Sequence, residues 1–503
     1  MANIVLTTLN AKYIHASLGL RYLYANLKEL QSECEIHEYT IKTRPIDIAE
    51  ALLKLKPKII GFGVYIWNTQ ETLAVISQIK TISPETIIIL GGPEISYETE
   101  SQVLLEYADY VLTGAADISF YHLCHDLIND KQPDKKILKS APIDLKELTF
   151  PYQYYSDEDL HHRLLYVEAS RGCPFKCEFC LSALDKTSYP FDLDCFLNEM
   201  DKLYQRGARH FKFVDRTFNL KIANTLKILD FFLARLDDDL FLHFEVIPDH
   251  LPDQLKDALM KFPQGCLQFE VGIQSFDSEV QRLISRKQNN DKSKANLLWL
   301  RENTHAHIHA DLIFGLPGET LESFKQSFND LYTCKPHEIQ LGILKRLKGS
   351  PIIRHTNDFS LRFNPLPPFD ILSTNLVDFS TMQAINRFAR YWDMIGNSGR
   401  FKNSLPILLA EDPFNDFINL MQWIYSKTGQ THQINLKKLY ELVAQATHAL
   451  HLDRFDDLIA ALEIDYANSK LKGHFKGLRL IDTVETETAS QHKRSIRQQR
   501  HLG

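Results

Sequence analysis

The 503-residue chain has no apolar run close to the roughly 18 residues that a membrane-spanning helix requires. Its eight cysteines are too few for a disulfide framework, and its N-terminus lacks a basic segment followed by a long apolar core. The formal net charge of -7 and the pI of 6.3 give no overall positive charge for binding nucleic acid. We therefore expect a cytoplasmic protein that does not cross a membrane.

Short apolar segments alternate with amphipathic ones in the N-terminal quarter of the chain. The strand-like segments, continuous in apolar residues as buried parallel strands are, span residues 3–9, 34–41, 58–66, 86–92 and 109–114. Helical patterns lie between them, near residues 18–31, 46–56, 69–82, 96–107 and 117–128. This order predicts an α/β fold with a doubly wound, Rossmann-like domain over residues 1–135, whose ligands bind beyond the C-terminal ends of the strands.

The rest of the chain divides into four further parts by pattern. Residues 136–160 are polar and contain proline, which predicts a linker. Six strand-like segments, from LLYVEAS to EIQLGILKRL, then predict a partial (β/α)6 barrel over residues 161–355, with function at the C-terminal ends of its strands. Residues 356–485 have helical periodicity and predict a mostly helical domain, and the polar, basic residues 486–503 predict a disordered tail.

Three of the eight cysteines, Cys173, Cys177 and Cys180, follow the spacing C-x3-C-x2-C just after the first predicted barrel strand. Structural zinc takes four ligands, usually as two pairs, and an electron-transfer 4Fe–4S cluster also takes four cysteines. The next cysteine, Cys195, is distant and unpaired. Three thiolates suit an iron–sulfur cluster with one iron free to bind another molecule. A zinc loop or a chance cluster is the alternative.

The segment RGCPFKCEFC resembles the radical S-adenosylmethionine (SAM) superfamily, in which three cysteines hold a 4Fe–4S cluster. The resemblance implies that the free iron binds SAM and that one electron cleaves SAM to a 5′-deoxyadenosyl radical. Phe179 matches the aromatic residue that usually precedes the third cysteine. Such radical chemistry requires a cofactor, which the protein binds and orients.

The resemblance continues along the barrel and implies a set of residues that contact SAM. They are Asp215 in FKFVDRTFN, Glu245 in HFEVIPD, Gln274, Ser275 and Arg286 in VGIQSFDSEVQRLISR, and Asp311 in ADLIFGLPGET. On chemical grounds, Arg286 could pair with the SAM carboxylate and Gln274 could form a hydrogen bond with the ribose. The alternative is that the acidic residues are solvated at the rim of the barrel and that GLPGE is only a turn.

The domain in front resembles the cobalamin-binding domain of one large radical SAM subgroup, through IIGFGVYIWNTQET and IIILGGPEIS. The resemblance implies cobalamin contacts at Gly63, Thr69, Gly91, Gly92 and Pro93, where glycine lets the nucleotide tail of the corrin approach the backbone. NAD or FAD is disfavoured because no G-x-G-x-x-G follows the first strand. The alternative is a Rossmann-like module that binds nothing.

Two segments depart from the cobalamin pattern. Where D-x-H-x-x-G would supply a lower cobalt ligand, Tyr13 replaces the aspartate and Gly19 stands one position late, so His15 is not predicted to bind cobalt. The loop LTGAADISF has Ala115 and Ala116 in place of the usual Gly-Glu-Gly-Glu run. Farther on, FNPLPPFDIL and GNSGRFKNSLP resemble the helical C-terminal extension of a bacterial cobalamin-type radical SAM family.

These resemblances imply an enzyme with a 4Fe–4S cluster, SAM and cobalamin, and methylation of an unactivated carbon of an unknown substrate is the predicted reaction. Cyclisation, rearrangement or redox chemistry without methyl transfer is one alternative, and a non-enzymatic cobalamin or redox sensor or corrinoid carrier is another. The family would take electrons from flavodoxin or ferredoxin. Lys493, Arg494, Arg497 and Arg500 suggest a weak RNA contact, against the simpler interpretation of a solvated tail.

Overall fold

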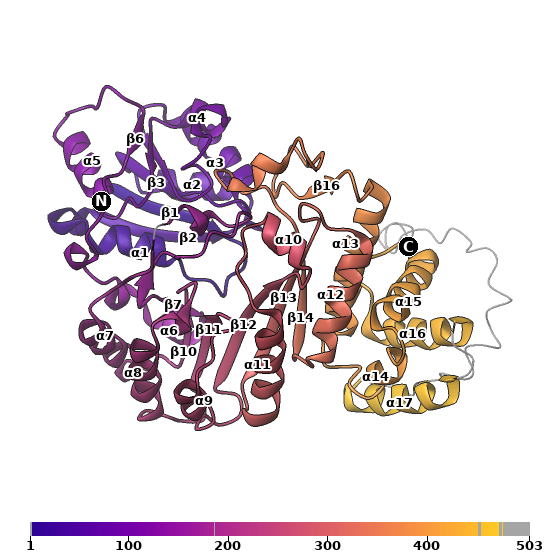
Figure 1. Ribbon diagram of the computed structural model, residues 1–503. Coiled ribbons are helices and arrows are strands. Elements are labelled where there is room, and N and C mark those ends of the chain that lie inside the picture. The colour runs from indigo at the N-terminus through magenta and orange to yellow at the C-terminus, as the bar shows by residue number, and fades with distance from the viewer. Residues whose placement is uncertain (1–2, 186, 451–453, 472–474, 476–503) are drawn as a thin grey trace, which may run out of the picture. The chain divides into compact units, whose positions relative to one another are not determined.

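The computed structural model describes residues 3–185, 187–450, 454–471 and 475 (Figure 1). The chain forms two compact units, Met1–Gln383 and Ala384–Gly503. The first unit contains two six-stranded sheets, and all strand pairs within these sheets are parallel.

The N-terminal sheet has the strand order β2-β1-β3-β4-β5-β6. Its strands are β1 (Ile4–Asn10), β2 (Cys34–Thr40), β3 (Ile59–Gly63), β4 (Ile87–Gly91), β5 (Tyr110–Thr113) and β6 (Ile137–Lys139). The first five are the predicted strands. The order reverses between β1 and β3, and the crevice of a doubly wound sheet lies at such a reversal.

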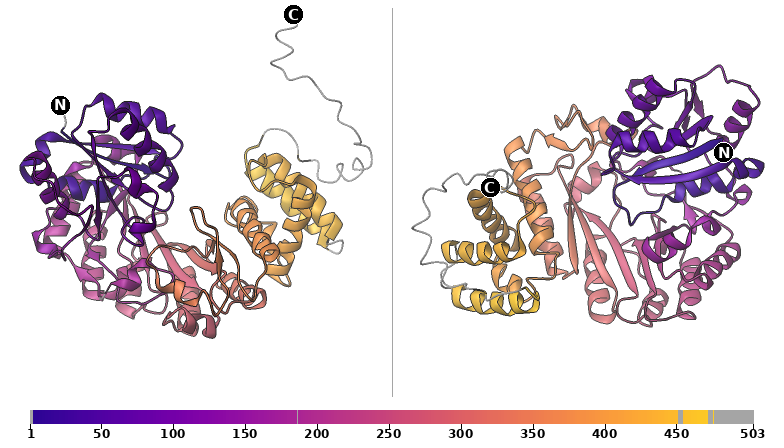
Figure 2. Two further views of the ribbon diagram at one scale, coloured as in Figure 1. Left: turned by 90° about the horizontal axis from the view of Figure 1, so that it is seen from above. Right: turned by 180° about the vertical axis from the view of Figure 1, so that it is seen from behind.

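Alternate residues of these strands point to opposite faces, and each face is covered by helices (Figures 1 and 2). The helices are α1 (Leu18–Ala25), α2 (Pro45–Lys54), α3 (Thr69–Ile82), α4 (Leu104–Tyr107) and α5 (Ser119–Ile128). Val5 and Leu9 pack with α2 and α3, whereas Ile4 and Leu6 pack with α1 and α5. The predicted doubly wound domain is confirmed.

The second sheet has the order β14-β13-β12-β11-β10-β7 and confirms the predicted six-stranded partial barrel. Its strands are β7 (Leu165–Val167), β10 (His210–Phe213), β11 (Phe241–Val246), β12 (Leu267–Gln274), β13 (His307–Phe314) and β14 (Glu338–Ile343). The intervening helices are α7 (Leu193–Gln205), α8 (Ile222–Leu233), α9 (Asp253–Leu259), α10 (Ser278–Leu283), α11 (Asn290–Asn303) and α12 (Leu321–Thr333).

The two faces of the barrel strands differ in chemistry. The buried residues of β12, such as Phe269 and Val271, alternate with the half-buried Glu270 and Gly272. The same alternation places His309 and Asp311 of β13 on the half-buried face. A closed barrel fills its interior with branched apolar side chains, whereas this face is polar. It is therefore suited to bind polar ligands.

The segment 136–160, predicted to be a linker, is folded. It supplies β6 and the helix α6 (Asp157–His162), and β6 pairs with β5. Tyr152 and Tyr155 are almost fully buried, and their hydroxyl groups donate to the carbonyl oxygens of Glu168 (3.1 Å) and Tyr166 (2.7 Å). The segment thus packs against the first barrel strand instead of connecting two domains loosely.

The chain after β14 forms a 3-10 helix (Pro351–His355) and a short hairpin of β15 (Arg362–Phe363) and β16 (Ile371–Ser373). The predicted helices follow as α13 (Phe379–Ile395), α14 (Leu405–Leu408), α15 (Pro413–Thr428), α16 (Leu436–Leu450) and α17 (Phe455–Asn468). The boundary between the compact units falls within α13. The predicted tail, residues 486–503, lies outside the described residues. No helix in the described part of the chain is both long and apolar enough to span a bilayer.

Candidate active site

The cysteine loop follows the first barrel strand, β7, and turns tightly. Cys180 N–H donates to the carbonyl oxygen of Cys177 at 3.0 Å. Gly172 permits the turn, because its φ is +95° and a Cβ atom there would lie 2.5 Å from the carbonyl oxygen of Thr187. Cys173, Cys177 and Cys180 all line one cavity of ≈ 280 Å³.

The surroundings of the thiols suit a multi-iron cluster. Burial raises the pKa of Cys173 and Cys177, and Arg286 Nη1, 3.6 Å from Cys177 Sγ, opposes this effect at Cys177. Within the described ranges, no three His, Cys, Asp or Glu side chains converge on a single metal ion. Three thiols that line one cavity are a donor set that an iron–sulfur cluster would use.

Polar side chains from later barrel segments line the same cavity: Glu245 on β11, Gln274 on β12, Arg286 after α10 and Asp311 on β13. Gln274 Oε1 and Asp311 Oδ1 are buried and lack a hydrogen-bond partner within the described part of the protein. Gln274 has a φ of +70°, and a Cβ atom at Gly272 would lie 2.5 Å from Gln274 Nε2. Two buried oxygen atoms without a hydrogen bond fit a ligand that brings hydroxyl or ammonium donors, as SAM does.

The charges in this cavity are arranged in pairs. Burial, with Glu270 and Glu245 nearby, raises the pKa of Asp311 well above its usual range, which favours its protonated form. Glu245 Oε1 lies 3.2 Å from Arg216 Nη1. The hydrogen bond from His243, 3.0 Å long, is the main reason that the pKa of Glu270 falls to about 2. The cavity therefore combines a carboxyl group that favours its neutral form with compensated charges.

Two residues predicted to contact SAM do not line the cavity. The buried carboxylate of Asp215 accepts hydrogen bonds from Ala169 N–H (2.9 Å) and Ser170 O–H (2.6 Å), and burial raises its pKa to about 7. Ser275 is fully buried, and its hydroxyl oxygen accepts from Asp277 N–H at 3.2 Å. Both side chains stabilise loops beside the cavity. The other predicted SAM and cluster residues line it, Phe179 included.

Some lining residues were not predicted from the sequence, and they include Phe175, Arg216, Thr217, Glu270, Gly272 and Gln288. Glu270 and Gly272 share the two-residue period of β12 with Gln274, so this period could have identified them. Arg216 lies in the loop after β10, where no period applies. Only the three-dimensional fold brings its side chain to the cavity.

A second cavity, of ≈ 290 Å³, lies at the C-terminal ends of β3, β4 and β5. It is lined by the predicted residues Gly63, Gly91 and Gly92, and by Ala115 and Ala116 in the loop that departs from the usual sequence. Side chains of ordinary size at these positions would narrow it. A cavity lined by glycine and alanine fits an elongated group such as the nucleotide tail of cobalamin.

The glycines of this cavity have different tasks. Gly92 has a φ of +108°, and a Cβ atom there would lie 2.5 Å from the carbonyl oxygen of Val64, so the backbone conformation requires glycine. A Cβ atom at Gly91 would meet only the carbonyl oxygen of Leu112, at 3.8 Å. Gly91 therefore keeps the cavity open without being needed for the fold.

Two residues predicted to contact cobalamin, Thr69 and Pro93, do not line this cavity. Thr69 is the first residue of α3, and its hydroxyl group donates to the carbonyl oxygen of Tyr65 at 3.0 Å. The residue before it, Asn68, donates from its side-chain amide to the carbonyl oxygens of Leu9 and Gly63 at 3.1 Å. Thr69 thus stabilises the start of the helix.

A third cavity, of ≈ 470 Å³, adjoins the second and shares Leu18, Gly19 and Tyr65 with it. His15 also lines it, and His15 Nδ1 lies 2.7 Å from the hydroxyl oxygen of Tyr166 on β7. Burial lowers the pKa of His15, which favours a neutral ring. Residues of both sheets therefore meet in this cavity.

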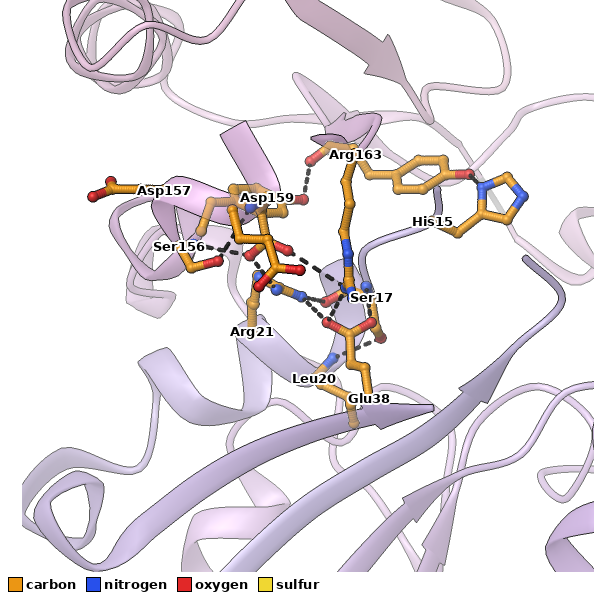
Figure 3. Close-up of polar contacts among 12 residues, drawn as sticks. His15, Ser17, Leu20, Arg21, Glu38, Ser156, Asp157, Asp159 and Arg163 are labelled. Carbon is orange, nitrogen blue, oxygen red and sulfur yellow. Dashed lines mark hydrogen bonds and ion pairs between the residues drawn. The ribbon is translucent and has the colours of Figure 1, made fainter. Parts of the chain in front are cut away.

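A buried ionic network holds the loop after β1 in place (Figure 3). Arg21 of α1 lies 2.7 Å from both Glu38 and Asp159, and each of these side chains is 5% exposed. Arg163 adds contacts to the same two carboxylates at 3.4 Å. Glu38 also accepts a hydrogen bond from Ser17 N–H at 2.7 Å. The network joins the N-terminal sheet to the helix that precedes the barrel.

Arg171 links the second cavity to the cysteine loop. It lines the second cavity together with Asp117 and Glu168, to which it forms ion pairs of 3.2 and 2.5 Å. Its guanidinium carbon lies 4.8 Å from the centre of the Tyr22 ring. Two residues farther along the chain, Cys173 lines the first cavity. The two cavities therefore share one short stretch of backbone.

Comparison with known proteins agrees with this architecture. The sequence matches the family models of the radical SAM superfamily over residues 167–331 and of the B12 binding domain over residues 4–123. A third match, over residues 357–502, is to a protein of unknown function, DUF4080.

Relatives of known name share low identity with the chain. It is 23% identical over 330 residues to the uncharacterized methyltransferase PH0819 of Pyrococcus horikoshii. This alignment covers 61% of the present chain and 70% of PH0819. It is 22% identical over 369 residues to the cobalamin-dependent radical SAM methyltransferase TokK of Streptomyces tokunonensis. This alignment covers 65% of the present chain and 53% of TokK.

Two solved structures share the fold. The cobalamin-dependent S-adenosylmethionine radical enzyme OxsB has a TM-score of 0.64 at 13% identity. The superposition covers 95% of the present chain and 82% of the OxsB chain. The radical S-adenosylmethionine methyltransferase TsrM from Kitasatospora setae has a TM-score of 0.58 at 15% identity. The superposition covers 94% of the present chain and 100% of the TsrM chain.

The barrel, the cysteine loop and the matched domain define a radical SAM enzyme. A B12 binding domain precedes the barrel, so the chain is a cobalamin-dependent radical SAM enzyme with a 4Fe–4S cluster, SAM and cobalamin as cofactors. The residues present fit these groups, because three thiols and two buried oxygen atoms without a hydrogen bond line one cavity and small residues line the other.

Proposed function

We propose that the enzyme methylates an unactivated carbon of its substrate. The observation that carries the proposal is that the cavity with the three thiols and the cavity lined by glycines lie in one compact unit and share the Arg171–Cys173 segment. When bound, the cluster supplies the electron that cleaves SAM and the corrin supplies a methyl group. The names of PH0819 and TokK, both methyltransferases, support this reaction over rearrangement.

In this proposal the protein side chains orient SAM. Cys173, Cys177 and Cys180 hold the cluster, and Arg286 neutralises the carboxylate of SAM. Gln274 Oε1 is available to accept a hydrogen bond from a ribose hydroxyl group because it has no partner among the residues described. Phe179 covers one side of the cavity and excludes water from it.

Two acidic residues complete the SAM site in this proposal. Burial favours the protonated form of Asp311, in which the hydroxyl oxygen donates and the other oxygen accepts. Glu245 is compensated by Arg216 and can accept a hydrogen bond from the ammonium group of SAM without leaving an unpaired charge. Gly63, Gly91 and Gly92 form the wall that admits cobalamin.

The substrate is expected to be polar. Lys212, His243 and Glu270 lie on the half-buried face of the barrel strands, with Glu270 Oε2 3.2 Å from Lys212 Nζ and 3.0 Å from His243 Nε2. His309 Nε2 is buried and lies 3.7 Å from Asp311 Oδ1, beyond hydrogen-bond distance. A substrate with hydrogen-bonding groups would be compatible with these polar side chains, whereas a hydrocarbon would not compensate for the loss of their hydration.

Electrons would come from a small carrier protein such as flavodoxin or ferredoxin, since the described residues include no second cysteine cluster. The basic residues Lys493, Arg494, Arg497 and Arg500, considered for a weak RNA contact, lie outside the described residues.

The test uses protein purified without oxygen from cells supplied with cobalamin. It is given SAM, a reductant and extracts fractionated by polarity, and the products S-adenosylhomocysteine and 5′-deoxyadenosine are quantified. Comparable amounts of both, dependent on cobalamin, would support methyl transfer. 5′-Deoxyadenosine alone would favour rearrangement or redox chemistry, and neither product would favour a sensor or carrier. Cys177→Ala is the control that lacks the cluster.

A further inference from the structure

Glu178 lies between two of the cluster cysteines, yet its side chain does not line their cavity. It is 3% exposed, and its carboxylate is enclosed by protein. A buried carboxylate costs free energy unless other groups compensate it, so its surroundings indicate what it does.

The compensating groups come from two distant segments. Ser285 O–H donates to Glu178 Oε1 at 2.5 Å, and His355 Nε2 lies 2.8 Å from Glu178 Oε2. Arg354 forms an ion pair with the same carboxylate. Every oxygen of Glu178 therefore has a partner.

The backbone of Glu178 makes the same two connections. Its N–H group donates to the carbonyl oxygen of Ile284 at 3.0 Å, and its carbonyl oxygen accepts from Ile352 N–H at 2.9 Å. Ile352 is fully buried. The cysteine loop is thus attached by side chain and backbone to the end of α10 and to the 3-10 helix Pro351–His355, which follows the matched radical SAM region.

The contact with Ser285 has a further effect on the cavity. Ser285 has a φ of +55°, a conformation that is strained for a residue with a side chain. The bond to Glu178 holds it there. The next residue, Arg286, lies 3.6 Å from Cys177 Sγ and also donates to the carbonyl oxygen of Gly272. The contacts therefore lead from Glu178 to Ser285 and from its neighbour Arg286 back to Cys177 in the same loop.

We propose that Glu178 is a positioning residue for the iron–sulfur cluster. By binding Ser285 and His355 it fixes the spacing of Cys177 and Cys180 and directs Arg286 to the Cys177 thiolate. The cluster needs this support because one of its irons has no protein ligand. The inference does not depend on methyl transfer, since it concerns how the protein holds the cluster in any radical SAM reaction.

The experiment compares Glu178→Ala with the matched control Glu279→Ala. Glu279 lies on α10, is 61% exposed and pairs only with Arg282 among the described residues. Both proteins are reconstituted with iron and sulfide, and the rate of iron loss to a chelator is measured. Partners of metal ligands typically contribute about 10- to 100-fold to metal affinity, so Glu178→Ala should lose iron about 10- to 100-fold faster than Glu279→Ala.

A second readout separates positioning from simple stabilisation of the fold. The electron paramagnetic resonance spectrum of the reduced cluster, with and without SAM, should change in Glu178→Ala because Arg286 is no longer held at Cys177. Glu178→Gln, which keeps the shape and can accept from Ser285, should restore most of the wild-type spectrum. Iron loss within twofold of the control, with an unchanged spectrum, would overturn the proposal even if the melting temperature fell.

Ser285→Gly covers the case in which Glu178→Ala does not fold. Glycine adopts a φ of +55° without strain, so this variant removes the hydrogen bond to Glu178 and spares the backbone. It should fold and still show faster iron loss and an altered spectrum. If it keeps iron and spectrum like the wild type, Glu178 does not act through Ser285 and the proposal is wrong.

Discussion

Gly91 allows the cavity proposed for cobalamin to be narrowed by substitution while β4, the strand that carries Gly91, stays intact. Its φ is not in the left-handed region, and a Cβ atom there would meet only the carbonyl oxygen of Leu112, at 3.8 Å. Valine at this position keeps a strand conformation, which β-branched residues favour. Because Gly91 lines the cavity, the new methyl groups would occupy space proposed for cobalamin.

The size of the effect follows from overpacking. The cavity measures ≈ 290 Å³, and extra methyl groups in a filled site cost about 1–3 kcal/mol. This range corresponds to about 5- to 150-fold weaker binding. Gly91→Ala should have the smallest effect, Gly91→Val a larger one and Gly91→Leu the largest. Gly92→Ala should instead destabilise the domain, because its Cβ atom would lie 2.5 Å from the carbonyl oxygen of Val64.

Hydroxocobalamin titration of the cobalamin-free protein measures the effect, with quenching of intrinsic fluorescence as the signal. Iron content after reconstitution should stay at the wild-type level, since the thiols line a different cavity. Ile87→Val, at the other end of β4 and outside the cavity, is the matched control. If Gly91→Leu bound hydroxocobalamin as tightly as this control, the cavity would not be the cobalamin site.

Three further predictions concern the barrel. Cys177→Ala should abolish iron binding and SAM cleavage but leave hydroxocobalamin binding intact. Burial raises the pKa of Asp215 from 3.8 to about 7, so its stabilising effect is full below pH 3.8 and is lost as the pH rises through about 7. Asp215→Asn should therefore weaken the fall in urea midpoint between about pH 4 and 7. The pKa of Glu270 is lowered from 4.5 to about 2 by His243 and Lys212, so its contribution is full above pH 4.5 and is lost toward pH 2. Glu270→Gln should lower the unfolding free energy at neutral pH and reduce the acid sensitivity in urea titrations.

Most of the fold could be predicted because its strands are buried on one or both faces. Continuous apolar segments such as residues 58–66 and 86–92 have few other ways to be buried. The strand β6 was missed, since its three residues, Ile137–Lys139, have no apolar run. Its pairing with β5 depends on where the preceding helix ends. Such tertiary pairing has no local signal.

The site was predicted best where a residue lies on a regular strand. Glu245 and Asp311 line the cavity because a period of two fixes their direction on β11 and β13. Asp215 lies two residues after the end of β10, where the chain turns, and its carboxylate accepts a hydrogen bond from the backbone N–H of Ala169 instead. Its neighbour Arg216 lines the cavity. In such a loop, a prediction that is wrong by one residue selects a buried side chain such as Asp215 in place of the cavity-lining Arg216.

The position of Arg171 has a consequence for how the two cavities are coupled. Arg171 lines the cavity proposed for cobalamin and Cys173 lines the cavity with the three thiols, and two residues of chain span at most about 7 Å. The chain bends between them at Gly172, where a Cβ atom would lie 2.5 Å from the carbonyl oxygen of Thr187. Covalent bonds therefore hold Arg171 next to the cysteine loop, whereas its ion pair with Asp117 attaches it non-covalently to the loop after β5. A change in the distance between the glycine-lined wall and the cysteine loop would strain or break this ion pair.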